Sequence, residues 1–105
     1  MMKELTVKDY NKEVKHFKGR SLIDFYSPSC GPCRALKPVL EAFAKESGIK
    51  VLMVDVGEEG ILTKAYGVDA LPTLIAVENG HIIGKAQGLQ KKANLYELFQ
   101  QVHPN

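Results

Sequence analysis

Both cysteines of the chain stand in one short segment, Cys30-Gly31-Pro32-Cys33, and no other residues are so well suited to chemistry. If Cys30 lies at the start of a helix and Cys33 one turn further on, their Cα atoms lie ~5–6 Å apart, the separation that a disulfide requires. Gly31 allows the backbone to bend, and Pro32 suits the first helical turn. The positive end of the helix favours a thiolate at Cys30, and a thiolate is the form that attacks disulfides. The spacing therefore indicates thiol–disulfide exchange.

Two other interpretations of the cysteine pair stay open. A CxxC segment is also half of a tetrahedral zinc site, but the sequence has no further cysteine, and His16, His81 and His103 are scattered without zinc-ligand spacing. Zinc would then need a site shared between two chains. A purely structural disulfide is the other alternative, although so short a loop restricts the unfolded chain little. Redox chemistry is favoured if the pair lies between a strand and a helix.

The elements that would hold the pair follow from apolar periodicity and from Gly, Pro and Asn-Gly turn signals. Strands are expected over residues 22–26, 49–56, 73–77 and 81–86, and helices over residues 8–17, 32–47, 58–66 and 91–102. Residues 5–7 are expected to form a short edge strand or an extended lead-in. Thr6 and Asp9 suggest a capping box for the first helix. The order βαβαβαββα, with parallel strands, crossover helices and one antiparallel hairpin, predicts a three-layer α/β/α sandwich around a mixed sheet. We expect residues 1–105 to form a single domain.

Composition excludes several classes of function. The 105 residues are 45% hydrophobic and 25% charged, which is ordinary for a soluble globular protein. The net charge is +2, and the basic residues are spread along the chain, so neither nucleic acid nor a polybasic membrane anchor is expected as a partner. The charged start of the chain does not have the pattern of a signal peptide, and no apolar run is long enough to span a bilayer. A cytoplasmic location is expected, where a cysteine pair is more often catalytic than structural.

Taken together, these motifs are similar to those of the thioredoxin family over nearly the whole chain. The matching segments are Asp24-Phe25-Tyr26, Cys30-Gly31-Pro32-Cys33, Pro38, Leu71-Pro72-Thr73, Asn79-Gly80 and Gly88. The resemblance implies the thioredoxin fold, with the strand at 22–26 in the middle of the sheet and the cysteine pair at its carboxyl end. Open α/β sheets bind ligands at that edge.

The resemblance also assigns roles to three residues. Cys30 corresponds to the exposed attacking thiol, and Cys33 to the buried resolving thiol. Asp24 corresponds to the family's buried acid, which takes the proton of Cys33. A carboxylate inside the apolar segment 22–26 is costly unless it is protonated or hydrogen-bonded, so its pKa is expected to be raised. An Asp that simply reaches solvent is the alternative.

The family also has a cis-proline at the position of Pro72, packed against the cysteines. Without the resemblance this could not be predicted, because only ~5–6% of X–Pro bonds in folded proteins are cis. The backbone of Leu71 would then pair with an extended substrate strand. The expected substrate-docking surface consists of Gly31, Pro32, Ala70, Leu71, Pro72 and Gly88.

The expected activity is reduction of protein disulfides by a monomer that a thioredoxin reductase recharges. The redox-active Cys30–Cys33 disulfide would be the only redox group, with no cofactor and no metal. The alternatives are an oxidase or isomerase of the same fold, or a non-catalytic accessory subunit. Three residues depart from the family pattern. Ser29 stands where Trp is usual, and Tyr26 stands where Trp is common. Val51 stands where a lysine is frequent near the buried acid, although a shift of the comparison by one residue would put the adjacent Lys50 there.

Overall fold

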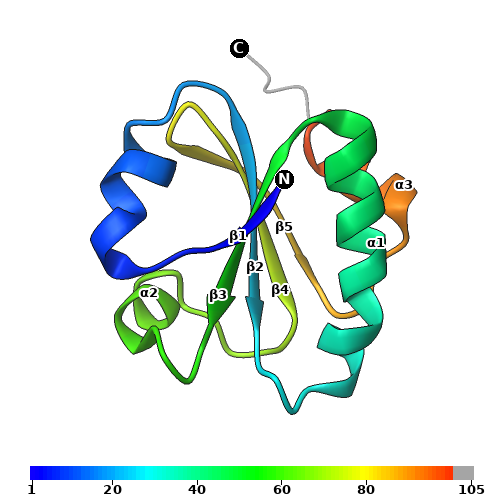
Figure 1. Cartoon of the computed structure of the whole chain (residues 1–105), viewed down its shortest axis with the longest axis horizontal. Coiled ribbons are helices and arrows are strands. Elements are labelled where there is room, and N and C mark those ends of the chain that lie inside the picture. The colour runs from blue at the N-terminus through cyan, green and yellow to red at the C-terminus, as the bar shows by residue number, and fades with distance from the viewer. Residues whose placement is uncertain (101–105) are drawn as a thin grey trace.

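The apolar segment around Asp24 forms the centre of the fold. In the computed structural model, which describes residues 1–100, five strands make one mixed sheet in the order β1-β3-β2-β4-β5. The strands are β1 (Met2–Glu4), β2 (Arg20–Tyr26), β3 (Lys50–Asp55), β4 (Thr73–Glu78) and β5 (His81–Gln87). Strand β2 lies in the middle, as predicted, and its carboxyl end meets that of β3 at one edge of the sheet (Figure 1).

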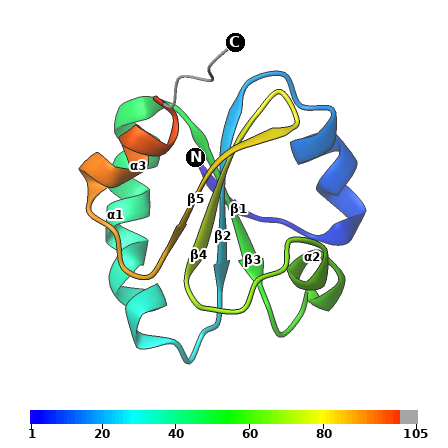
Figure 2. The ribbon, with the colours of Figure 1, turned by 180° about the vertical axis from the view of Figure 1, so that it is seen from behind.

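Helical segments cover both faces of this sheet. They are η1 (Val7–Asp9), η2 (Asn11–Lys15), α1 (Gly31–Ser47), α2 (Gly60–Ala65) and α3 (Lys92–Leu98). Helices α1 and α3 lie on one face, and α2 lies with η1 and η2 on the other (Figures 1 and 2). Because strand side chains alternate, Leu22 packs in the core under α1 and α3, whereas Ile23 and Phe25 pack in the core under α2 and η2. The predicted three-layer sandwich is confirmed.

The direction of β4 differs from the expected run of parallel strands. Strand β4 pairs antiparallel with β2 and with β5, whereas β1, β3 and β2 are parallel. Helix α2 has only six residues and spans ~9 Å, so it does not carry the chain back to the other end of the sheet. Thr73, the first residue of β4, therefore pairs with Phe25 near the carboxyl end of β2. This arrangement brings Pro72 to the same edge as the cysteine segment.

The first strand lies earlier than predicted. Of the two predictions for residues 5–7, the edge strand is wrong. Strand β1 ends at Glu4, Leu5 is buried and donates its N–H to the Met53 carbonyl at 2.8 Å, and Val7 already begins a 3₁₀ turn. Thr6 and Val7 have strand propensity, but the buried side chain of Leu5 holds the chain where it leaves the sheet. Here the position of an anchoring core residue overrides local propensity.

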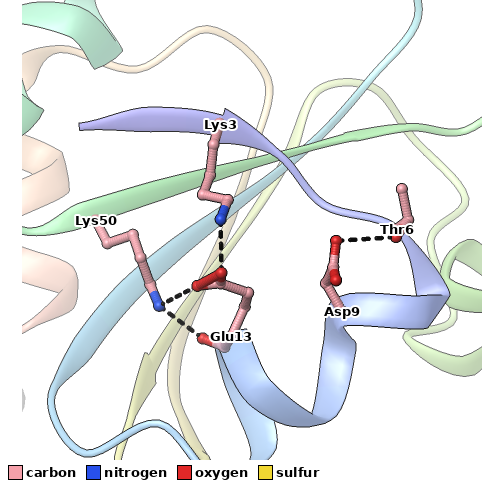
Figure 3. A network of polar contacts seen from close by, with 5 residues as sticks. All are labelled: Lys3, Thr6, Asp9, Glu13 and Lys50. Atoms are coloured by element: carbon pink, nitrogen blue, oxygen red, sulfur yellow. Dashed lines mark hydrogen bonds and ion pairs between the residues drawn. The ribbon is translucent and has the colours of Figure 1, made fainter.

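The α-helix expected over residues 8–17 is replaced by the 3₁₀ turn η1 and the π-helical turn η2. The wide turn is closed by the N–H of His16, which donates to the Asn11 carbonyl at 2.8 Å. It turns Glu13 toward the sheet, where two lysines bind its carboxylate. The capping box is also absent, because Thr6 Oγ1 donates to Asp9 Oδ2 at 3.3 Å instead of the Thr6 side chain accepting a backbone N–H (Figure 3).

The other elements agree with the sequence to within a few residues. Helix α1 ends at Gly48, which adopts φ +73°, and α2 is shorter than predicted. The Asn79-Gly80 turn joins β4 to β5 with φ +50° and +82°, and a Cβ on Gly80 would lie 2.5 Å from the Lys15 carbonyl oxygen. Helix α3 ends at Leu98, before the predicted end at residue 102, which lies outside the described residues.

Candidate functional site

The cysteine pair lies between β2 and α1, at the carboxyl end of the central strand. Cys30 is the N-cap residue of α1, and its Sγ accepts the backbone N–H of Cys33 at 3.2 Å. The two cysteines form a disulfide, with their Cα atoms 5.2 Å apart. Pro32 lies in the first turn of α1, where its missing N–H leaves no broken hydrogen bond. The predicted strand–motif–helix arrangement is therefore present.

The two sulfurs have different access to solvent. Cys33 is buried, with 5% of its surface exposed, whereas Cys30 is half-buried and is followed by the exposed residues Gly31 and Pro32. Because Cys30 also stands at the positive end of a 17-residue helix, a thiolate at this position is favoured electrostatically. Cys30 is thus the more accessible of the two cysteines.

Asp24 lies two residues before the end of β2 and is completely buried. Among residues 1–100, neither of its carboxylate oxygens has a hydrogen-bond partner, and its cross-strand neighbours are Met53 and Leu74. Burial raises the pKa of Asp24 to about 7, and the negative charge of Glu4 contributes to the rise. The alternative of an Asp that reaches solvent is wrong. A carboxyl group with this pKa exchanges its proton near neutral pH.

A second buried carboxylate, Glu13, lies on the opposite face of the sheet and was not found by sequence reasoning. Its Oε2 accepts from Lys3 at 2.6 Å and its Oε1 from Lys50 at 2.9 Å, and Lys50 also donates to the Glu13 carbonyl at 2.9 Å (Figure 3). These hydrogen bonds, first that from Lys3 and then that from Lys50, lower the pKa of Glu13 to about 2. The three residues come from η2, β1 and β3, so no local motif indicates the cluster.

The position of Lys50 shows whether Lys50 or Val51 occupies the site where thioredoxins frequently have a lysine. Lys50 binds Glu13, and its Nζ lies 3.3 Å from the centre of the Phe17 ring, on the face covered by η2. Val51 is the residue of β3 that belongs to the core under α1 and α3, on the face of Asp24. The structure thus agrees with the alignment that puts Val51 at the usual lysine position. Lys50 supplies no compensating charge to Asp24.

The segment before β4 completes this edge of the sheet. The Leu71–Pro72 bond is cis, as predicted, and the N–H of Gly88 donates to the Pro72 carbonyl at 2.8 Å. Ala70 is exposed, while Leu71 and Gly88 are half-buried. Pro72 itself is buried, so its neighbours form the accessible part of the predicted docking surface.

Comparison with known proteins now assigns the family. The sequence model of the thioredoxin family matches residues 1–101. The chain belongs to the thioredoxin family. It is 37% identical over 92 residues to a thioredoxin of Bacillus subtilis (strain 168), which covers 86% of this chain and 88% of the relative. A thioredoxin of Chlamydia caviae is 33% identical over 102 residues, covering 96% of this chain and 98% of the relative.

A solved structure agrees with this assignment. A mutant thioredoxin from Halobacterium salinarum NRC-1 superposes with a TM-score of 0.86 at 31% sequence identity, covering 98% of this chain and 94% of that one. Together with the Cys30–Cys33 disulfide, the family assignment makes this chain a protein thiol–disulfide oxidoreductase whose redox group is that disulfide. Within residues 1–100, no three His, Cys, Asp or Glu side chains gather as a metal site. No helix in this range is long and apolar enough to cross a membrane.

The departures from the thioredoxin pattern change the surroundings of Cys33. Ser29 is exposed, its hydroxyl shares a hydrogen bond with the Ser27 hydroxyl at 3.1 Å, and its N–H donates to the same oxygen at 3.4 Å. The hydroxyl of Tyr26 donates to both carboxylate oxygens of Glu4, at 2.9 and 3.0 Å. A contact between β1 and the end of β2 depends on sheet register, so sequence reasoning missed it.

Beside this contact a groove of about 510 Å³ opens on the flank of Cys33. Its walls come from β1, the end of β2, β3 and the first turns of α1. They are formed by Met2, Lys3, Glu4, Tyr26, Ser27, Pro28, Cys33, Arg34, Lys37 and Met53. The groove is separate from the loops that carry Ala70, Leu71 and Gly88, none of which lines it.

Proposed function

We propose that this thioredoxin-family protein acts as a reductant of protein disulfides. The observation that carries this proposal is the disulfide at the start of α1, with the half-exposed Cys30 in front of the buried Cys33. An exposed sulfur can be reached by a protein substrate. A buried partner one turn away is protected from solution reagents but is close enough to displace the substrate.

The first step is attack of the Cys30 thiolate on a sulfur of the substrate disulfide. The substrate S–S bond breaks, one substrate sulfur leaves as a thiolate that takes a proton from water, and Cys30 is joined to the other sulfur. The helix start favours the thiolate form of Cys30, which supports this role.

The second step uses Cys33 and Asp24. The Cys33 thiol gives its proton to the Asp24 carboxylate, the resulting thiolate attacks Cys30 Sγ, and the substrate leaves as its second thiolate. The Cys30–Cys33 bond forms, so two electrons pass to the substrate. A carboxyl group with a pKa of about 7 and no hydrogen-bond partner is suited to taking up this proton.

Substrate docking would use the surface around Cys30. Gly31, Pro32 and Ala70 are exposed, and Leu71 and Gly88 are half-buried beside the cis-Pro72 peptide. The small residues Gly31, Ala70 and Gly88 on this surface support pairing of the Leu71 backbone with an extended substrate segment.

The cycle requires a donor that reduces the Cys30–Cys33 disulfide again. We assign this role to a thioredoxin reductase, in keeping with the family. We also propose that residues 1–105 act as one domain and as a monomer in the cytoplasm. The small net charge and the absence of a membrane-spanning helix among residues 1–100 are compatible with this setting.

Trapping with single cysteine variants tests the roles of the two sulfurs. Cys33→Ser should accumulate a mixed disulfide with protein substrates at Cys30, and Cys30→Ser should accumulate none and abolish turnover. Alkylation of the reduced protein near neutral pH should modify Cys30 before Cys33. A trapped adduct on Cys33, or turnover by Cys30→Ser, would contradict the assignment.

The reduction potential separates a reductant from an oxidase of the same fold. The pair should have a potential near −270 mV, whereas a strong oxidant of this kind lies at about −120 mV. Equilibration with a glutathione redox buffer gives the value directly. A potential close to that of the oxidant would replace the proposed function by the oxidase alternative.

A further inference from the structure

The groove beside Cys33 holds a carboxylate that the steps above do not use. Glu4 is exposed at the end of β1, and both oxygens of its carboxylate share the single O–H of Tyr26 in a three-centre hydrogen bond. Burial, followed by the hydrogen bond to Glu4, raises the pKa of Tyr26, so the hydroxyl stays protonated and remains the donor. Glu4 and Cys33 both line the groove.

Sheet register connects Glu4 to Asp24. Glu4 pairs with Met53 across β1 and β3, and Met53 pairs with Asp24 across β3 and β2. Directly paired residues point to the same face of a sheet, so both carboxylates lie on the face covered by α1. With a strand spacing of ~4.8 Å, their Cα atoms are ~10 Å apart. Met53, which is 7% exposed, is the residue of the intervening strand β3 that pairs with both.

Few other charged groups face Asp24. Strand β4 places Leu74 opposite it, and helix α3 contributes Leu95 and Leu98 to this core. The titratable and charged groups on the side of the groove are Cys33, Arg34 and Lys37 of α1, Lys3 and Glu4 of β1, Tyr26 of β2 and Asp55 at the end of β3.

Most of these groups are engaged or turned to solvent. Arg34 and Lys37 are exposed, and Arg34 donates to the Pro28 carbonyl at 3.1 Å. Lys3 pairs with Glu13 on the other face. Glu4 therefore has a fixed position in line with Asp24.

We propose that Glu4, anchored by Tyr26, is a positioning residue that sets the pH at which the buried carboxyl group of Asp24 takes up and releases its proton. The inference rests on the proposed role of Asp24 as the proton acceptor of Cys33. A negative charge at Glu4 opposes a second negative charge at Asp24. Asp24 thus stays protonated to higher pH than it would beside a neutral residue, and the Cys33 step is fastest only above that pH.

Titration of Asp24 in the oxidised protein tests the inference without any turnover, because the disulfide cysteines do not titrate. The carboxyl carbon signal of Asp24 should titrate near neutral pH in the wild type. In Glu4→Gln its midpoint should fall by about half a pH unit at low salt, as expected for a charge ~10 Å away across a partly wet groove. Glu41→Gln, which removes an exposed charge on α1 outside the groove, is the matched control and should leave the midpoint unchanged.

Tyr26→Phe tests the anchoring. It frees the Glu4 carboxylate but leaves its charge, so the Asp24 midpoint should shift in the same direction by a smaller amount. An unchanged midpoint in Tyr26→Phe would overturn the anchoring role of Tyr26. Equal midpoints in Glu4→Gln and Glu41→Gln would overturn the role of Glu4.

The pH profile of substrate release from the mixed disulfide provides the functional readout. In Glu4→Gln the rise of the rate should move to lower pH by the same interval as the Asp24 titration, and Asp24→Asn should flatten the profile. If Asp24→Asn keeps the wild-type profile, the proposed acceptor role of Asp24 fails. If Asp24→Asn flattens it but Glu4→Gln matches Glu41→Gln, only the inference about Glu4 fails.

Discussion

Asp24 and Glu13 are two buried carboxylates on opposite faces of one sheet, and their surroundings differ completely. Asp24 is fully buried and has no hydrogen-bond partner in the part of the chain that the structure describes, whereas Glu13 is 7% exposed and accepts from Lys3 and Lys50. The pKa of Asp24 is raised to about 7, and that of Glu13 is lowered to about 2. Burial alone thus does not decide the charge state of an acid.

The difference follows from what replaces water around each group. Desolvation disfavours the charged form in both places, but at Glu13 two ammonium groups more than offset it. At Asp24 no cation among the described residues offsets desolvation. Strand β3 places Val51 and Met53 on that face of the sheet, and its lysine, Lys50, lies on the other face. One carboxylate is left free to exchange protons, and the other is committed to holding η2 on the sheet.

The largest effect is expected from Asp24→Asn. The raised pKa of Asp24 in the wild type means that burying the ionised carboxylate costs free energy. This cost begins above pH ~3.9, grows with pH and levels off above the pKa of Asp24 in the folded protein. Asn has no such charge. The substitution should raise the free energy of unfolding by about 2–4 kcal/mol at pH 8 and change it little at pH 4. Urea titrations at both pH values measure this, and lower stability at pH 8 would show that Asp24 is solvated.

The same substitution should reduce activity. Without an acceptor for the Cys33 proton, disulfide reduction at neutral pH should slow at least about tenfold, which is modest for loss of a proton-transfer group. Rates with an insulin-type disulfide substrate test this. An equally fast Asp24→Asn protein would remove Asp24 from the mechanism.

Glu13→Gln should have the opposite effect on stability. A lowered pKa makes the contribution of Glu13 fully present above pH ~4.3, and it is lost as pH falls toward 2. The free energy of unfolding of the variant should be about 1–2 kcal/mol lower than that of the wild type at pH 7 and should approach the wild-type value at pH 2–3. Glu58→Gln makes the same change at an exposed glutamate and serves as the control, and its free energy of unfolding should stay near that of the wild type. A loss independent of pH would indicate a packing effect instead.

The smallest effect separates the two lysines of Glu13. The Lys3 side chain is 38% exposed and the Lys50 side chain 13%, so solvent and salt screen the Lys3 pair more. Lys3→Gln should destabilise less than Lys50→Gln, and 0.5 M salt should diminish the Lys3 effect first. Thermal unfolding at two salt concentrations compares them. The reverse order would mean that the partly exposed Lys3–Glu13 pair contributes more to stability than the Lys50–Glu13 pair.

The sequence predicted the parts of the site that depend on local patterns. The spacing of Cys30 and Cys33 indicated a disulfide at a helix start, and the apolar neighbours of Asp24 indicated burial and a raised pKa. All three features are confirmed. The cis bond at Pro72 was predicted from the family resemblance alone, since no local signal distinguishes it from a trans bond. The catalytic roles of these residues stay predictions.

Features that join distant segments could not be predicted in this way. Lys50 and Glu13 are 37 residues apart, and Tyr26 and Glu4 are 22 apart. Their contacts depend on strand register, which a one-residue shift would reverse. The antiparallel direction of β4 was missed for a related reason, because the length of a connection does not show where its helix lies. The groove beside Cys33 depends on strand register and on where the neighbouring helix lies.

Strand β1 is the shortest strand of the sheet, with three residues at its edge, yet it reaches both carboxylates. Its alternation sends Lys3 to Glu13 on one face and Glu4 toward Asp24 on the other. A short edge strand is among the first elements to open by local unfolding. When β1 detaches, Glu13 loses a donor and Asp24 loses a neighbouring negative charge in the same event. Amide hydrogen exchange at β1 therefore reports a fluctuation that both faces of the sheet share.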